Sequence, residues 1–260
     1  ATGRRCLEDR ARRLIGSDGT FSQYSPIYHR VMLDTYALAE IWRRSLNLPV
    51  FSDILHERLR AATVWLQAMM IEESGDVPNI GANDGSRLLP LTDTDYRDFR
   101  PSLQLAATLF LGARIVDAPG PWDQPLYWFG VDRPNSTLPP PRSVTLDDGG
   151  FHILRIGTAM AVLRYPRFRF RPSQADALHL DLWSGGRNIL RDAGSFSYAS
   201  EEGAWFTGTS AHNTAEFDGR DQMPRLGRFL FGAWLKAYGV ASVREDGRRS
   251  VAAAAGYRDA

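Results

Sequence analysis

The chain has 260 residues, of which 43% are hydrophobic and 23% charged, which excludes a disordered polyelectrolyte and allows one large or two ordinary globular domains. The formal net charge is only +1, so the protein has no strong overall electrostatic field that would favour binding to nucleic acid or to a membrane surface. An acidic ligand must therefore be held by a local cluster of cations. The single cysteine, Cys6, excludes an internal disulfide framework, and no apolar run approaches the ~20 residues of a membrane span.

Residues 1 to about 113 have the apolar spacing of helices, which predicts helices over roughly residues 26–46, 53–73 and 100–113. Ser25 and Pro26 suit the start of the first of these helices. Its expected buried stripe consists of Tyr28, Met32, Thr35, Ala39, Trp42 and Leu46. The stripe of the second helix consists of Leu55, Leu59, Ala62, Leu66 and Met69.

The remainder of the chain changes character twice. Residues 119–142 are rich in proline, which excludes a long helix and predicts a linker. From about residue 143 the apolar period becomes two, and "SVTLDDGGFHIL" and "ASVREDGRRSVA" have the pattern of β-hairpins. The sequence therefore predicts an α+β protein with a helical segment over 1–118, a linker over 119–142 and an antiparallel β-sandwich over 143–260.

Both ends of the sequence are those expected of a piece of a longer protein. The first residue is not Met, the first residues show no signal-peptide pattern, and "AAAAGYRDA" at the end is typical of a strand. We therefore expect the sandwich to be truncated and partner segments to lie outside this chain.

Two histidines and an aspartate lie near predicted strand edges or turns: His179, Asp192 and His212. Two imidazoles and one carboxylate on neighbouring strands can bind Zn²⁺. In "LHLDLW" the alternation places His179, Asp181 and Trp183 on the strand face opposite the leucines, which we expect to face the core. No short motif joins the three residues, so the alternative is a surface imidazole, a turn aspartate and a structural histidine.

Four further residues have a functional and a structural interpretation. Tyr28 and His29 stand in the first turn of a predicted helix, where a tyrosine ring more often packs in the core. Asn83, in "NDG", is most simply part of a turn. Trp205 can stack on a sugar ring, although tryptophan packs in a core more often. The sequence has no Gly-rich phosphate loop and no G-x-S-x-G elbow.

Four stretches, taken in order, resemble the heparinase II/III family of polysaccharide lyases: "DGTFSQYSPIYHR", "NDGSRLLPL", "LHLDLWSGGRNILRDAGSFSY" and "SAHNTAEFDGRDQ". The resemblance runs from about residue 18 to residue 235. It implies an incomplete (α/α) toroid followed by an antiparallel β-sandwich. It also implies a bacterial lyase, periplasmic or extracellular, that acts on an acidic polysaccharide of the glycosaminoglycan or alginate type.

The resemblance implies roles for individual residues in β-elimination. A base removes the proton at C5, α to the carboxylate, and an acid protonates the leaving oxygen at C4. Tyr28 matches the family's catalytic tyrosine, and His212 belongs to the same catalytic site. Candidates for substrate binding are His29, Asn83, Asn213 and Trp205. For His29 the alternative is a packing role.

The resemblance also implies a structural metal, with Asp192 and His212 as ligands. Gln174 stands where family members often have a histidine, and Pro172 falls near the place of the catalytic histidine, so His179 is the expected third ligand of a zinc ion. The family's carboxylate-neutralising asparagine lies upstream of "SPIYHR", before this chain begins. These departures leave a second hypothesis open, a non-catalytic carbohydrate-binding or surface-polysaccharide assembly protein on the lyase scaffold.

Overall fold

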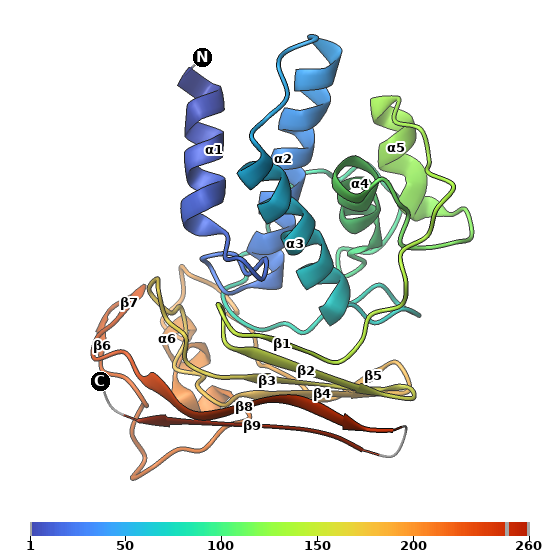
Figure 1. Cartoon of the computed structure of the whole chain (residues 1–260). Helices are drawn as coiled ribbons and strands as arrows, with labels where there is room; N and C mark the ends of the chain where they lie inside the picture. The colour runs from blue at the N-terminus through green and yellow to red at the C-terminus, as the bar shows by residue number, and fades with distance from the viewer. Residues whose placement is uncertain (1, 248–249, 259–260) are drawn as a thin grey trace. The chain divides into compact units, whose positions relative to one another are not determined.

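A computed structural model describes residues 2–247 and 250–258 (Figure 1). The chain forms two compact units. The helical unit comprises Ala1–Phe21, Ile27–Val77 and Ser86–Pro141, and the β unit comprises Ser22–Pro26, Pro78–Gly85 and Arg142–Ala260. Helices and antiparallel strands thus occupy successive parts of the sequence, which confirms the predicted mixture of the two, while two short stretches of the N-terminal half join the β unit.

The helical unit contains α1 (Thr2–Leu14), α2 (Pro26–Ser45), α3 (Asp53–Met69), α4 (Arg100–Leu111), the 3₁₀ helix η1 (Pro121–Asp123) and α5 (Gln124–Phe129). The three helices predicted from apolar spacing are confirmed as α2, α3 and α4. The proline-rich segment carries η1 and α5, which contact α4. Prolines at the first turns of both short helices are compatible with helix, because the first N–H groups have no intrahelical acceptor. None of the helices in the described ranges has the length and hydropathy that a bilayer span requires.

The predicted buried face is right for α3 and wrong for most of α2, where Met32 is buried but the other five predicted residues are not. All five residues of the α3 stripe are buried. On α2, Thr35 is exposed and Trp42 is 63% exposed, whereas Leu33 and Ile41 are buried. Apolar residues surround much of α2, so their period did not select one face. Its charged residue Glu40 is buried because it accepts hydrogen bonds from two arginines in the last turn of the helix.

A buried arginine and a buried aspartate lie one turn apart on α2. Arg30 donates from Nη1 to the Tyr96 carbonyl at 2.7 Å and from Nη2 to the Ser86 carbonyl at 3.2 Å, and its guanidinium lies 4.4 Å from the Phe99 ring centroid. Asp34 has no exposed surface. Burial raises the pKa of Asp34 from 3.8 to about 7, although the Arg30 charge acts in the opposite direction.

Asp34→Asn should therefore change how stability depends on pH. Between pH about 4 and about 7 the folded state holds a proton on Asp34 that the unfolded state has released, so the free energy of unfolding falls as pH rises through this window. The asparagine variant lacks this fall. Its free energy of unfolding, relative to that of the wild type, should therefore rise by ~1–3 kcal/mol when the pH is raised from 5 to 8. Urea unfolding at both pH values measures the difference. Asp132→Asn, at an exposed position, is the control, and equal pH slopes for all three proteins would refute the assignment.

The β unit contains a five-stranded antiparallel sheet in the order β1-β2-β3-β4-β5. Its strands are β1 (Val144–Leu146), β2 (Phe151–Ile156), β3 (Ala159–Arg164), β4 (Leu180–Ser184) and β5 (Arg187–Leu190). The short helices α6 (Gly203–Phe206) and η2 (Thr209–Ala211) follow. Two hairpins complete the unit: β6 (Arg225–Gly227) with β7 (Leu230–Phe231), and β8 (Lys236–Asp246) with β9 (Ser250–Arg258).

Both predicted hairpins are confirmed. β1 pairs antiparallel with β2, and β8 pairs antiparallel with β9. Figure 1 shows the long β8–β9 hairpin lying along the five-stranded sheet. Val243 N donates to Thr145 Oγ1 at 2.9 Å, and His152 Nε2 donates to the Ala254 carbonyl at 3.3 Å, so polar contacts join this hairpin to β1 and β2.

The expected orientation of "LHLDLW" is wrong. Asp181 and Trp183 on β4 are buried, as is His179 just before it, whereas Leu180 and Leu182 are half-buried. The buried carboxylate is compatible with this face because Asp181 Oδ1 accepts a hydrogen bond from Trp183 Nε1 at 2.5 Å. The face expected to be polar and solvated is therefore the one that carries the candidate site.

Candidate metal centre and active site

Three segments of the β unit bring together His179, Asp192 and His212. His179 immediately precedes β4, Asp192 lies two residues beyond β5, and His212 directly follows η2. One potential ligand atom from each lies within 4.8 Å of the other two, and all three side chains are fully buried. Residues that no sequence motif joins are therefore neighbours in space.

Asp192 links the two imidazoles. Its Oδ2 accepts a hydrogen bond from His212 Nδ1 at 2.9 Å and lies 3.6 Å from His179 Nε2. Its Oδ1 accepts a hydrogen bond from Gly194 N at 2.7 Å. Gly194 has φ +80°, and a Cβ there would lie 2.6 Å from Asn79 Nδ2, so this turn requires glycine. The glycine thereby holds the aspartate in the orientation in which it faces both rings.

The environment of His212 acts on its pKa in two directions. Burial lowers the pKa of the imidazole, but the Asp192 carboxylate raises it through a hydrogen bond and through its charge, and the net direction is upward. A proton therefore bridges His212 and Asp192 in the metal-free arrangement. A cation bound here would displace that proton, as ligands release protons when they bind metal.

The residues fit a zinc ion. In a tetrahedral site with bonds of about 2.0–2.1 Å the ligand atoms lie ~3.3 Å apart. The separations from Asp192 Oδ2 to His212 Nδ1 and to His179 Nε2 are 2.9 and 3.6 Å, and the two histidine ligand atoms lie within 4.8 Å of each other. His179 Nε2 is buried and has no hydrogen-bond partner among the described residues. Asn213 N donates to His179 Nδ1 at 3.2 Å, whereas ligating histidines usually donate from this second nitrogen. The second nitrogen of His212, Nε2, is buried and has no hydrogen-bond partner among the described residues. Neither ring therefore has the donated hydrogen bond that usually orients a ligating histidine.

Gln174 occupies a buried position beside the Asp192 turn. It has no exposed surface, and its Nε2 donates to the Gly194 carbonyl at 3.4 Å. Its Oε1 has no hydrogen-bond partner among the described residues. The glutamine therefore packs against the turn that holds Asp192 and supplies a neutral amide where an imidazole would supply a strong ligand. Pro172, two residues earlier, is also buried and has no titratable group.

A buried ion pair that the sequence analysis missed supports the same region. Arg164, at the end of β3, bonds to the carboxylate of Asp176, and their side chains are 1% and 0% exposed. Arg164 N also donates to the His179 carbonyl at 3.0 Å. The pair thus anchors the segment that carries Gln174 and His179 to the sheet. The only signal in the sequence was an aspartate in the otherwise apolar stretch "ADAL".

Comparison with known proteins assigns this part of the chain. The model of the family described as heparinase II/III-like, C-terminal, matches residues 138–260. Residues 138–260 are a heparinase II/III-like C-terminal domain. The resemblance stated from the sequence is thereby confirmed.

The relatives of this chain extend well beyond the residues that it matches. A heparin-sulfate lyase of Pedobacter heparinus is 24% identical over 232 residues, which cover 85% of this chain and 32% of the relative. The solved heparan sulfate lyase HepC of the same organism is similar over 93% of this chain and 38% of its own, with a TM-score of 0.61 and 20% identity. Heparinase III, the BT4657 gene product, has a TM-score of 0.66 at 16% identity and covers 98% of this chain and 39% of its own. The chain spans about a third of the length of these proteins.

Three of the four predicted substrate-binding residues belong to the β unit, and their surroundings differ. Asn213 is next to His212, and its Nδ2 donates to the Arg191 carbonyl at 3.1 Å. Asn83 forms the predicted turn, since its Oδ1 accepts from Gly85 N at 2.9 Å, and its own N–H donates to Ser195 Oγ at 3.0 Å. Trp205 on α6 is 55% exposed. Asn213 thus adjoins the cluster directly, Asn83 adjoins it through the segment after Asp192, and Trp205 presents a ring to solvent.

Tyr28 and His29 occupy different environments in the first turn of α2. Tyr28 is half-buried. His29 is fully buried, donates from Nε2 to the Ala62 carbonyl at 2.8 Å and stacks on Trp65 with 4.4 Å between ring centroids. Burial lowers the pKa of His29 to about 4, so the ring is neutral at physiological pH. The contacts of His29 support its packing alternative, while Tyr28 retains surface through which a ligand can reach it.

Proposed function

We propose that this chain is part of a polysaccharide lyase that cleaves an acidic, uronate-containing glycan by β-elimination. The family match over 138–260 and the lyase names of the relatives support this proposal. The observation that carries it is the buried Asp192–His212 pair, because it places a hydrogen-bonded, oriented imidazole in the heparinase II/III-like domain. The helices are proposed to be part of an (α/α) toroid and the strands a β-sandwich, in a bacterial protein of the periplasm or cell exterior.

The proposed chemistry assigns separate tasks to the chain's own residues. The reaction removes the proton at C5 and breaks the bond between C4 and the glycosidic oxygen, which leaves a C4–C5 double bond on one product. Tyr28 carries a hydroxyl that can accept a proton as phenolate and donate it as phenol, the two steps that elimination requires. Without bound metal, His212, oriented by Asp192, is the candidate imidazole of the β unit; with zinc bound it would serve as a ligand instead. Asn213 is a candidate for holding a sugar hydroxyl. Negative charge that develops on the substrate carboxylate needs a fixed donor nearby.

We propose that His179, Asp192 and His212 hold a zinc ion, with water as the fourth ligand. When bound, the ion would supply a cross-link between the three segments that carry His179, Asp192 and His212. An amide oxygen at Gln174 is a poor zinc ligand, so the proposed site rests on these three residues alone.

Zinc content tests the metal site directly. Protein purified without chelator should contain stoichiometric zinc by elemental analysis, and His212→Ala should lose it, because only His179 and Asp192 then remain as ligands from the chain. His56→Ala, on α3 of the helical unit, should retain the zinc of the wild type. Circular dichroism should show that the His212 variant still folds, since the sandwich core is apolar. Zinc no higher than background in the wild-type protein would reject the site.

Ultraviolet absorbance tests the function. Elimination produces a C4–C5 double bond conjugated with the carboxylate, so the intact protein should raise ultraviolet absorbance with at least one member of a panel of uronate polysaccharides. Gln174 in place of the usual histidine favours the second hypothesis, a carbohydrate-binding protein on the lyase scaffold. That hypothesis predicts saturable binding of a polysaccharide from the panel with no change in absorbance.

A further inference from the structure

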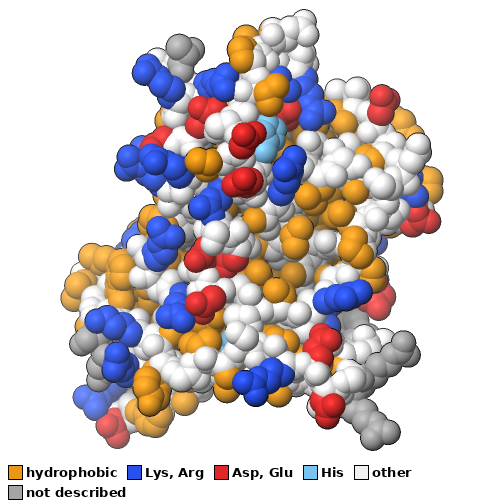
Figure 2. Space-filling view, viewed as in Figure 1, with side chains coloured by type: hydrophobic (Ala, Val, Ile, Leu, Met, Phe, Trp, Pro, Cys, Tyr) orange, Lys and Arg blue, Asp and Glu red, His pale blue; other side chains and the backbone are white. Residues whose placement is uncertain are grey.

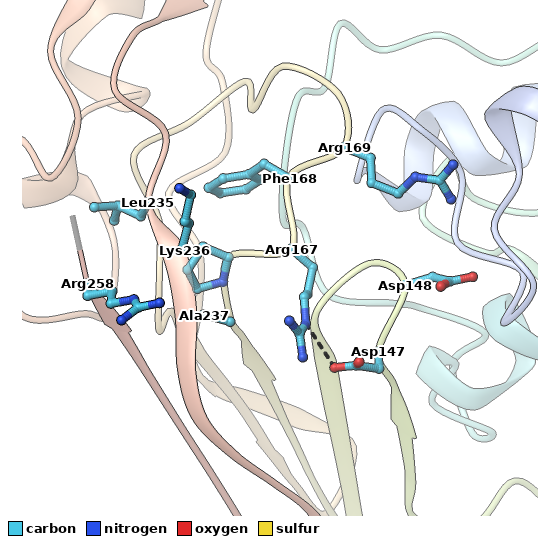
Figure 3. A pocket seen from close by; sticks show the side chains of 10 residues that line it. Asp147, Asp148, Arg167, Phe168, Arg169, Leu235, Lys236, Ala237 and Arg258 are labelled. Atoms are coloured by element: carbon cyan, nitrogen blue, oxygen red, sulfur yellow. Dashed lines mark hydrogen bonds and ion pairs between the residues drawn. The ribbon is translucent and has the colours of Figure 1, made fainter. Parts of the chain in front are cut away.

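A cavity of about 460 Å³ lies in the β unit and shares no residue with the His179–Asp192–His212 cluster. Its walls come from the β1–β2 turn, the loop that follows β3, the start of β8 and the end of β9 (Figure 3). This volume falls in the range of ~300–1,000 Å³ that is usual for small-molecule sites. The space is therefore large enough for a sugar unit and not only for a small ion.

The charge of the cavity wall is predominantly positive. Four basic residues and two acidic residues line it. One of the acids, Asp147, is already engaged, because its Oδ1 accepts hydrogen bonds from Tyr165 Oη at 2.8 Å and from Arg167 Nε at 3.1 Å. Figure 2 shows basic side chains scattered over the face in view rather than gathered in one field, so an acidic ligand depends on local clusters such as this one.

Two of the cations face each other across the β8–β9 ladder. Lys236 and Arg258 are paired in register, and both are exposed. Like charges directly opposite each other destabilise a sheet. Neither side chain has an ion-pair partner within residues 2–247 and 250–258 that could offset this repulsion. An anion bound between them would relieve it.

An aromatic side chain beside these cations is held in place from behind. Phe168 packs partly buried against the small apolar core that contains Leu235, and its ring makes an edge contact with Tyr24 at 6.0 Å. Tyr24 Oη accepts hydrogen bonds from Arg169 N at 2.9 Å and Phe170 N at 3.2 Å, which pins the loop. Figure 3 shows Phe168 lying next to the Lys236 side chain. A fixed ring beside a cation is the combination that binds a sugar face and its acidic substituent together.

We propose that this cavity is a second glycan-binding site, separate from the candidate catalytic residues. It binds one acidic sugar unit of the polymer. Lys236 and Arg258 hold its carboxylate or sulfate, and Phe168 stacks against the ring. The proposal rests on the proposed function in its choice of an acidic glycan. It differs from a bare anion site because the aromatic wall and the volume exceed what an inorganic ion needs.

Calorimetric titration of the full chain tests the site with three probes: a sulfated uronate-containing tetrasaccharide, the same tetrasaccharide without sulfate, and inorganic sulfate. The double variant Lys236→Gln/Arg258→Gln should bind the better tetrasaccharide at least ~10-fold more weakly than the wild type. Phe168→Leu should weaken tetrasaccharide binding and leave sulfate binding unchanged. Arg187→Gln removes an exposed arginine at the start of β5 and should bind within ~2-fold of the wild type.

The outcomes separate this site from the lyase activity. Comparison of the two tetrasaccharides identifies sulfate or carboxylate as the group that is held. Unchanged affinity in the Lys236/Arg258 double variant, no tetrasaccharide binding by the wild type, or inorganic sulfate binding as tightly as the tetrasaccharide would overturn the proposal. Tetrasaccharide binding through this cavity, together with no ultraviolet-absorbing product from the intact protein, would contradict the lyase and leave the glycan site standing.

Discussion

Arg164→Met is expected to lower the free energy of unfolding by about 3–5 kcal/mol, because it leaves the carboxylate of Asp176 buried without its partner. Both side chains lie out of contact with water, and no other ion pair involving Asp176 exists among the described residues. A buried, uncompensated charge costs more than the loss of the contact itself. Urea unfolding followed by tryptophan fluorescence measures the effect.

Two further variants make this prediction specific. Arg164→Met/Asp176→Leu replaces the whole pair by apolar groups and should recover much of the loss, since it leaves no unpaired charge. Arg220→Met breaks an ion pair with Asp218 whose side chains are each 77% exposed, and should cost less than about 1 kcal/mol. If Arg164→Met were no more destabilising than Arg220→Met, the buried pair would have no role in holding the segment before β4.

Tyr28→Phe is expected to reduce turnover at least ~100-fold, the lower end of what acid–base catalysis contributes. The substitution removes the proton that the hydroxyl transfers and keeps the ring that packs at the start of α2. Initial rates of ultraviolet absorbance increase with a cleaved polysaccharide measure it, at substrate concentrations that separate kcat from KM. Stability should change little.

Tyr36→Phe provides the matched control for this experiment. It removes a hydroxyl from the same helix, one that donates to the Leu7 carbonyl at 3.0 Å, and should leave turnover unchanged. A Tyr28→Phe enzyme with wild-type turnover would return Tyr28 to a core-packing role and move the search for the acid and base elsewhere in the protein.

Local features were predictable because they depend on neighbours in the chain. The apolar spacing of α3 and the turn residues of the β1–β2 hairpin act over a few positions, and the structure has these elements where the sequence predicts them. The motifs "SPIYHR" and "SAHNT" likewise identified the family from short stretches. By contrast, α2 has apolar residues around much of its circumference, so its buried face depended on which helices surround it.

What the sequence by itself determined is therefore the order of elements, the residue types of the candidate site and the family. Only the tertiary structure decided that the polar face of "LHLDLW" is buried, that Asp192 lies between His179 and His212, and that Arg164 meets Asp176. The register of β8 and β9 similarly placed Lys236 opposite Arg258. Each of these depends on contacts between segments distant in the chain, and a buried charge is stable only where such a contact supplies its partner.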